Sequence, residues 1–155
     1  MLNIFTVSFF GHRIIENGSE VEKRLDDLIR GFIREKEYID FLVGRNGDFD
    51  QFVSSAVHRA KKSIDDANNS LILVLPYSTA EYSNNKASFE EYYDEVEIYS
   101  ASHYKSAFQE RNREMVDRSD LVIFCIDRDS GGAYQTAKYA KKTNKQYYNI
   151  GSYNL

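Results

Sequence analysis

The sequence predicts an α/β protein, a Rossmann-like three-layer sandwich with a mostly parallel sheet of about five strands. Two observations predict this fold. Short apolar runs rich in β-branched and aromatic residues recur along the chain, and segments with apolar residues at helical spacing lie between them. Because parallel neighbours need a long return connection, strands that alternate with helices of this length indicate crossover units.

The predicted strands share a nearly continuous apolar character, which is typical of strands buried on both faces of a sheet. They cover residues 4–10, 38–43, 70–75, 121–126 and, more weakly, 146–150.

Apolar residues at helical spacing mark four helices, near residues 21–33, 52–64, 104–116 and 133–140. Ser19 and Glu22 have the spacing of a capping box, which would start the first helix. Asp50 is placed to cap the second.

Length and composition indicate a single domain over residues 1–155, with a Tyr-rich excursion at residues 76–103. The apolar runs are far shorter than the roughly 20 residues that span a bilayer, so we expect no membrane association. The N-terminal residues lack a signal-peptide pattern, and the only cysteine, Cys125, lies within an apolar run. These features predict a cytoplasmic protein.

The formal net charge of −4 argues against a protein that neutralises many phosphates. We therefore expect nucleic acid to be an unlikely partner. A small anionic ligand remains possible because it needs only a local positive site.

The excursion begins at the only proline, Pro76, and six tyrosines lie between residues 76 and 104. A short helix is expected near residues 88–93. The tyrosines either cover the sheet with half-buried rings or form a lid that stacks on a ligand.

Two loops that follow predicted strands carry candidate binding residues. After the first strand, Gly11 allows close backbone approach and Arg13 could contact a phosphate, although an ordinary turn would look the same. After the second strand, amides near glycines could hold an anion at a helix start, and an aspartate could bind ribose hydroxyls. This loop, which is either a ligand loop or a structural turn, contains Gly44, Asn46, Gly47 and Asp48.

The loop after the fourth strand has the composition of a phosphate cradle. Gly131 and Gly132 have no side chain to block a ligand, and Ser130 and Thr136 add hydroxyls near the expected helix start. The spacing is neither that of a P-loop nor that of the dinucleotide-binding fingerprint.

Arg111 lies three residues after Phe108 and four before Met115, which places its guanidinium on the apolar side of the third helix. A buried guanidinium is costly without a partner. We expect either a bound anion or a structural ion pair, with Asp117, Asp120 or an acid of the Tyr-rich segment as the partner. Arg113 lies off this stripe and is expected to be solvated.

Five segments together resemble the SLOG superfamily: SFFGHR, FLVGRNGDFD, LPYSTAEY, RNREMVDRSDLVIF and SGGAYQTAKYA. This Rossmann-like group includes the LOG phosphoribohydrolases, the lysine decarboxylase-like proteins and the DprA-type proteins. More narrowly, nearly the whole chain resembles a small, uncharacterised bacterial SLOG family. The resemblance implies a nucleotide-derived ligand at the carboxyl ends of the strands and a homodimer as a possible assembly.

The resemblance to LOG enzymes places Arg111 at the position of their catalytic arginine and Gly131 and Gly132 in their phosphate loop. Lys138 stands where those enzymes have a catalytic glutamate, and it would favour holding phosphate. Glycosidic hydrolysis needs a carboxylate near the sugar, so it would require a displaced acid such as Asp94 or Glu95.

The predicted function is therefore that of a sensor or binding module for a nucleotide-like small molecule. The alternatives are a nucleotide N-glycosidase with a displaced acid, whose catalytic residues are unknown, and an interaction protein with a vestigial site. No cofactor is expected. No metal site is expected either, because His12, His58 and His103 lie far apart and lack ligand spacing.

Overall fold

The computed structural model describes residues 1–64 and 66–155. Over these residues the chain forms one sheet of six strands in the order β4-β3-β2-β1-β5-β6, and every neighbouring pair is parallel. The predicted α/β class and sandwich are confirmed, with one strand more than expected. The strands are β1 (Ile4–Gly11), β2 (Tyr38–Val43), β3 (Asn69–Leu75), β4 (Glu95–Ile98), β5 (Leu121–Cys125) and β6 (Tyr147–Asn149).

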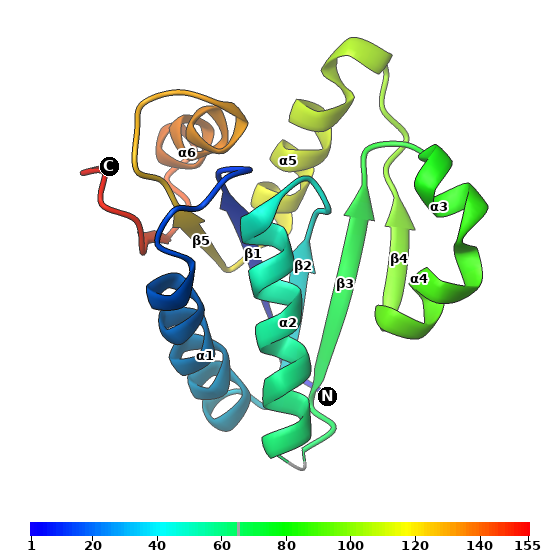
Figure 1. Cartoon of the computed structure of the whole chain (residues 1–155), viewed down its shortest axis with the longest axis vertical. Coiled ribbons are helices and arrows are strands. Elements are labelled where there is room, and N and C mark those ends of the chain that lie inside the picture. The colour runs from blue at the N-terminus through cyan, green and yellow to red at the C-terminus, as the bar shows by residue number, and fades with distance from the viewer. Residues whose placement is uncertain (65) are drawn as a thin grey trace.

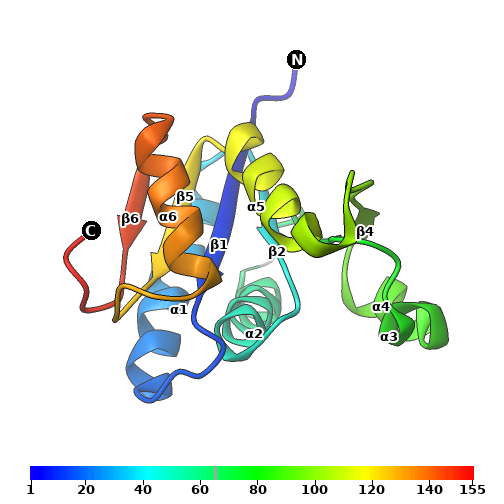
Figure 2. The ribbon, with the colours of Figure 1, turned by 90° about the horizontal axis from the view of Figure 1, so that it is seen from above.

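Helices cover both faces of the sheet (Figures 1 and 2). On one face lie α1 (Gly18–Glu35) and α2 (Asp48–Ser63), and on the other lie α5 (Ala107–Arg118) and α6 (Gly132–Lys142). Two short helices, α3 (Ala80–Asn84) and α4 (Lys86–Tyr92), lie beyond the β3–β4 edge. None of the helices described is long and apolar enough to cross a membrane.

The alternation of side chains along each strand divides the core into two layers. Phe9 and Phe41 belong to the layer that packs against α1 and α2. The adjacent Phe10 and Leu42 belong to the layer that includes Met115 of α5. Burial on both faces explains why these strands are apolar throughout.

The helix starts differ from the predicted caps. Helix α1 begins at Gly18 without a capping side chain, so Ser19 already lies in its first turn and the predicted capping box is wrong. Helix α2 begins at Asp48, and Asp50 does not cap it. The Asp50 carboxylate instead reaches back from the first turn and accepts the Asn46 N–H at 2.8 Å.

The Tyr-rich excursion contains the unpredicted strand β4 as well as the expected short helix, seen here as α4. Tyr82 and Tyr93 are buried against Phe89, with ring centroids 5.4 and 6.1 Å from it. These two rings act as a cover over the sheet edge. Tyr77 and Tyr104 lie elsewhere and have a different environment, described below.

The strand order reverses at β1, which lies between β2 and β5. In open α/β sheets, a crevice forms beyond the carboxyl ends of the strands at such a reversal. The loops that follow β1, β2 and β5 meet at this end of the sheet, at the top of Figure 1.

Candidate functional site

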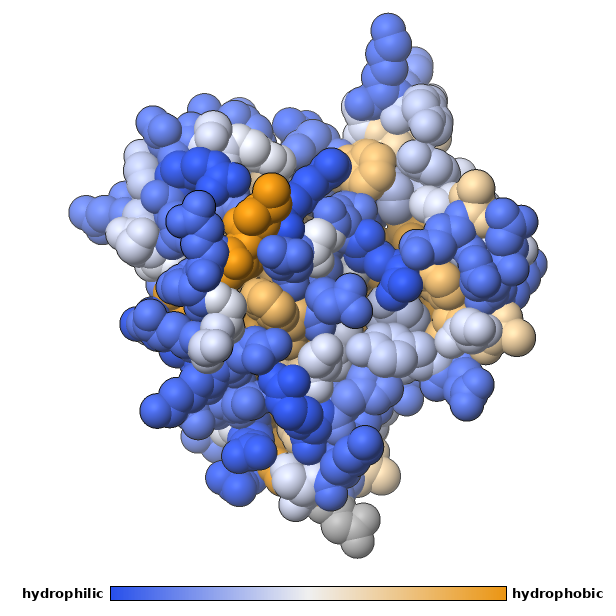
Figure 3. Space-filling view, viewed as in Figure 1, coloured by the Kyte–Doolittle hydropathy of each residue, from blue (hydrophilic) through white to orange (hydrophobic). Residues whose placement is uncertain are grey.

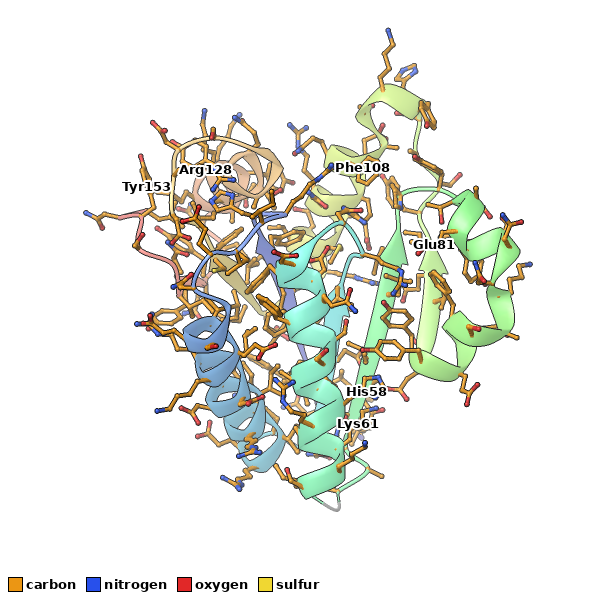
Figure 4. All side chains as sticks on the ribbon, in the orientation of Figure 1. His58, Lys61, Glu81, Phe108, Arg128 and Tyr153 are labelled. Atoms are coloured by element: carbon orange, nitrogen blue, oxygen red, sulfur yellow. The ribbon has the colours of Figure 1, made fainter. Side chains whose placement is uncertain are left out.

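A cavity of about 480 Å³ opens at the carboxyl ends of β1, β2 and β5. In Figure 4 the labelled residues Arg128, in the loop after β5, and Phe108, on α5, stand on either side of it. The lining comes from three strand-end loops and the starts of α5 and α6. It consists of Phe10, Gly11, His12, Arg13, Gly44, Asn46, Asp50, Lys105, Phe108, Gln109, Arg111, Asn112, Arg128, Gly131, Gly132 and Ala133.

The cavity is positive although the protein is not. Arg13, Lys105, Arg111 and Arg128 all line it, and among the residues that the structure describes Asp50 is the one carboxylate in the lining. Basic side chains gathered in a cleft create a local positive potential, whatever the net charge of the chain.

Arg111 lies on the inner wall of this cavity and is 2% exposed, as its helical position predicted. Its Nε donates to Asn112 Oδ1 at 3.0 Å, and its Nη1 donates to the carbonyl of Val74 at 2.9 Å. Among the described residues, no carboxylate forms an ion pair with it. Of the two alternatives, the ion pair with Asp117, Asp120 or an acid of the Tyr-rich segment is therefore not formed, and two neutral acceptors hold the guanidinium.

Asp50 is the acid whose charge attracts the Arg111 guanidinium. Burial lowers the pKa of Arg111 to about 10, and attraction to Asp50 opposes that shift. Burial also raises the pKa of Asp50, against the Asn46 hydrogen bond and the attraction of Arg111 and Arg13. At neutral pH Arg111 is therefore charged, and its charge is only partly balanced.

A chain of hydrogen bonds joins Arg111 to the start of α6. Asn112 accepts from Arg111 and its Nδ2 donates to Thr136 Oγ1 at 3.0 Å. The Thr136 hydroxyl in turn donates to the carbonyl of Gly132 at 2.9 Å. The buried cation and the glycine loop are thus held in a fixed relationship.

The loop after β5 turns into α6 at Gly131, whose φ is +94°. That conformation favours glycine because a Cβ would be strained there. Within the described residues no side chain caps α6, and Gly132 and Ala133 of its first turn line the cavity. The amides of a helix start, with the helix dipole, attract negative charge.

Seven of the predicted binding residues come together in the cavity: Gly11, Arg13, Gly44, Asn46, Arg111, Gly131 and Gly132. Gly47 and Asp48 instead line a second cavity of about 310 Å³, which shares Gly44 and Asp50 with the first. Asp48 Oδ2 accepts the N–H of Ile15 at 3.0 Å, which gives it a structural contact.

The remaining three predicted residues do not line the main cavity. Ser130 is exposed in its loop, and Thr136 is 1% exposed within the hydrogen-bond chain described above. Lys138 is exposed, and its Nζ lies 5.9 Å from the ring centre of Tyr134.

Sequence reasoning missed several lining residues, above all His12, Lys105 and Arg128. His12 and Arg128 could have been predicted from the sequence, because each lies within three residues of a predicted binding glycine. Lys105 precedes α5 and carried no such signal. Only the fold brings it to the cavity.

The acids proposed for a displaced catalytic role lie elsewhere. Asp94 and Glu95 stand at the amino end of β4, and Asp94 Oδ2 accepts the N–H of Leu71 at 2.7 Å. They are therefore at the opposite end of the strands from the cavity. Cys125 is buried, which raises the pKa of its thiol to about 12 and keeps it protonated at neutral pH.

Comparison with known proteins identifies similar folds but no family that matches in sequence. No protein-family model matches the chain, and no curated protein matches it. Among solved structures, it is similar to DNA processing protein A (DprA) from Streptococcus pneumoniae, with a TM-score of 0.70, and to DprA from Helicobacter pylori, with a TM-score of 0.68.

This likeness corrects one prediction. The Helicobacter pylori protein has a single-stranded DNA binding mode, so the prediction that nucleic acid is an unlikely partner is wrong. That prediction rested on a net charge of −4, which is a sum over the whole chain. It could not register that four cationic side chains meet at one cavity.

The structural match is extensive but distant in sequence. It covers 98% of this chain at 16% identity for the Streptococcus pneumoniae protein, and 96% at 18% identity for the Helicobacter pylori protein. The chain spans 52% and 66% of those two chains. It therefore has the Rossmann-like fold of DprA, in agreement with the resemblance of its sequence to the SLOG superfamily.

Proposed function

We propose that this chain is a binding module for a nucleotide, which it holds through a phosphate group in the cavity at the carboxyl ends of β1, β2 and β5. The observation that carries the proposal is the Arg111 guanidinium, which is 2% exposed, lines the cavity and forms no ion pair within the described residues. A bound phosphate would balance this charge.

The other lining residues suit the rest of a nucleotide. Arg13 and Arg128 are exposed at the mouth and could reach phosphate oxygens, while the α6 amides at Gly132 could bind them from below. The Asp50 carboxylate could accept hydrogen bonds from ribose hydroxyls. A volume of about 480 Å³ is within the range of small-ligand sites.

The single-stranded DNA binding of the Helicobacter pylori protein fits the same chemistry, because each unit of a strand is a nucleotide. The proposal therefore covers a free nucleotide and a nucleotide within a single strand.

Titration calorimetry with a panel of nucleoside monophosphates tests the proposal. Arg13→Ala and Arg128→Ala should each weaken binding by about 10- to 100-fold, since a hydrogen bond to a charged group contributes roughly 1.5–3 kcal/mol. Arg113→Ala is the matched control, because Arg113 is an exposed arginine of α5 that lies over Tyr139 and outside the cavity. Binding that is absent, or that is insensitive to both cavity substitutions, would contradict the proposal.

A nucleotide N-glycosidase is the second candidate function, and Asp50 is the observation that favours it. This carboxyl lies in the cavity beside Arg111, and burial raises its pKa, a property suited to proton transfer. Incubation with nucleoside monophosphates should then release free base, and Asp50→Asn should stop the release while ligand binding persists. If the wild-type protein releases no base, the chain binds nucleotides without cleaving them.

A further inference from the structure

Two tyrosines of the chain, the half-buried Tyr77 and the exposed Tyr104, form a pair beside the cavity. The rings of Tyr77 and Tyr104 lie 4.9 Å apart at an interplanar angle of 38°, and their hydroxyls are 3.3 Å apart. Tyr104 is 75% exposed. Unlike Tyr82 and Tyr93, these two tyrosines do not belong to the hydrophobic core of the described residues.

The pair adjoins the cavity through two residues. Phe108 lines the cavity, and its ring packs edge-to-face with that of Tyr77, with the ring centroids 6.0 Å apart. Lys105, the next residue after Tyr104, also lines the cavity. A separate hollow bounded by Tyr77, Tyr99 and Tyr104 adjoins the cavity, because Tyr104 precedes Lys105 of the cavity lining.

The segment that carries Tyr104 projects from the top of the molecule in Figures 1 and 3, and the surface around it is mostly hydrophilic. The Tyr104 ring, which is 75% exposed, gains little from burial within the fold. An exposed aromatic face can stack on another ring.

Glu110 holds this projecting segment in place. Its carboxylate accepts hydrogen bonds from Ser106 Oγ at 2.6 Å, from Ser102 N at 3.0 Å and Oγ at 2.9 Å, and from the N–H of His103 at 3.4 Å. These bonds, led by that from Ser106, lower the pKa of Glu110 to about 2, so it is ionised at neutral pH. The position of Tyr104 is therefore set before any ligand arrives.

We propose that Tyr77 and Tyr104 form a second subsite, which stacks the nucleobase joined by a phosphodiester to the nucleotide held in the cavity. Bases stack on aromatic side chains with little dependence on sequence, and Lys105 lies where it could meet the linking phosphate. The inference rests on the proposed function and adds to it a preference for ligands of two or more nucleotides.

Fluorescence anisotropy or calorimetry with thymidine 5′-monophosphate, the 5′-phosphorylated dithymidylate and a 5′-phosphorylated hexathymidylate tests the subsite. The wild-type protein should bind the dinucleotide about tenfold more tightly than the mononucleotide. Tyr104→Ala should remove this gain without changing mononucleotide affinity, and Tyr104→Trp should retain it. Tyr148→Ala is the matched control, because Tyr148 is 55% exposed on β6 at the opposite edge of the sheet.

A second variant tests the support of the platform. Glu110→Ala frees the segment at residues 102–106, so it should weaken dinucleotide binding more than mononucleotide binding and thereby reduce the dinucleotide gain. A hexanucleotide that binds more tightly than the dinucleotide supports the subsite with a single strand as the ligand, and equal affinities support it with a free dinucleotide.

The two proposals fail in different ways. Mononucleotide binding with no dinucleotide gain, or with a gain that Tyr104→Ala leaves unchanged, overturns the second subsite alone. Absence of binding to all three probes overturns both the subsite and the proposed function.

Discussion

The Nε2 atom of His12 accepts a hydrogen bond from the backbone N–H of Asp127 at 3.1 Å, which ties the loop after β1 to the loop after β5. A neutral imidazole that accepts at Nε2 carries its proton on Nδ1. A Cβ at Gly131 would lie 4.0 Å from that Nδ1. His12 thus joins two of the three loops of the cavity and presents an N–H toward the glycine loop.

This arrangement makes stability depend on pH through His12. Burial, with a further contribution from Arg128, lowers the pKa of His12 below 6.5, although Asp127 opposes the shift. The unfolded chain therefore takes up this proton before the folded chain does as pH falls. The free energy of unfolding should therefore decrease as pH drops below about 6.5. Above that pH, the titration of His12 should not change it further.

Thermal unfolding followed by circular dichroism between pH 5 and 8 measures this effect. His12→Gln should flatten the pH dependence below about pH 6.5. An unchanged slope in His12→Gln would show that other groups cause the dependence.

Two glycines should respond in opposite ways to alanine. At Gly47 a Cβ would lie 2.4 Å from the Cα of Arg13, so Gly47→Ala must push apart the loops after β1 and β2. We expect a loss of about 1–3 kcal/mol in the free energy of unfolding. At Gly31, within α1, no atom of the described residues lies within 4 Å of a Cβ, so Gly31→Ala should stabilise by about 0.5–1 kcal/mol.

Urea denaturation of the two variants checks this contrast. Equal losses of stability in Gly47→Ala and Gly31→Ala would show that the close contact of Gly47 with Arg13 does not cause the loss.

The main strands and helices were predictable because burial on both faces of the sheet leaves a long apolar signal. Strand β4 was not, because it lies at the sheet edge, spans Glu95–Ile98 and includes two glutamates. A short, partly polar edge strand carries no pattern that distinguishes it from a loop.

At the site, local spacing predicted the burial of Arg111 but not its partners. Val74 contributes a backbone carbonyl from 37 positions away, which no side-chain pattern records. Lys138 illustrates the limit of matching positions to a family motif. It follows Thr136 by two residues, so it lies on the other side of α6 and faces solvent.

Arg45 should stabilise the folded conformation of the Tyr-rich excursion. Its guanidinium donates to Glu81 Oε1 at 2.9 Å and to the Tyr93 hydroxyl at 3.0 Å, and it lies 4.6 Å from the ring centre of Phe89. Arg45→Met should cost about 1–2 kcal/mol of local stability, because Tyr93 and Glu81 lose their charged partner.

Hydrogen exchange should show faster amide exchange in α3 and α4 of this variant and unchanged exchange in β1 and β5. Arg59→Met is the matched control, since Arg59 pairs with Asp26 between α1 and α2. Uniformly faster exchange across the sheet would mean that Arg45 supports the whole fold and not the excursion alone.

Thr136 should act as a positioning residue for the cavity through its hydroxyl. Thr136→Val keeps the shape but removes the oxygen, so the buried Nδ2 of Asn112 loses its acceptor at 3.0 Å. An unsatisfied buried donor costs about 1–3 kcal/mol. Thr136→Ser keeps the oxygen and loses only a methyl group, which is worth roughly 0.8 kcal/mol.

The valine variant should therefore be the less stable of the two in urea denaturation. It should also bind nucleoside monophosphates more weakly than the serine variant, because Asn112 no longer fixes Arg111 relative to Gly132. Equal affinity in the two variants would show that the guanidinium is held by Val74 alone, and that the link from Arg111 to the start of α6 does not organise the cavity.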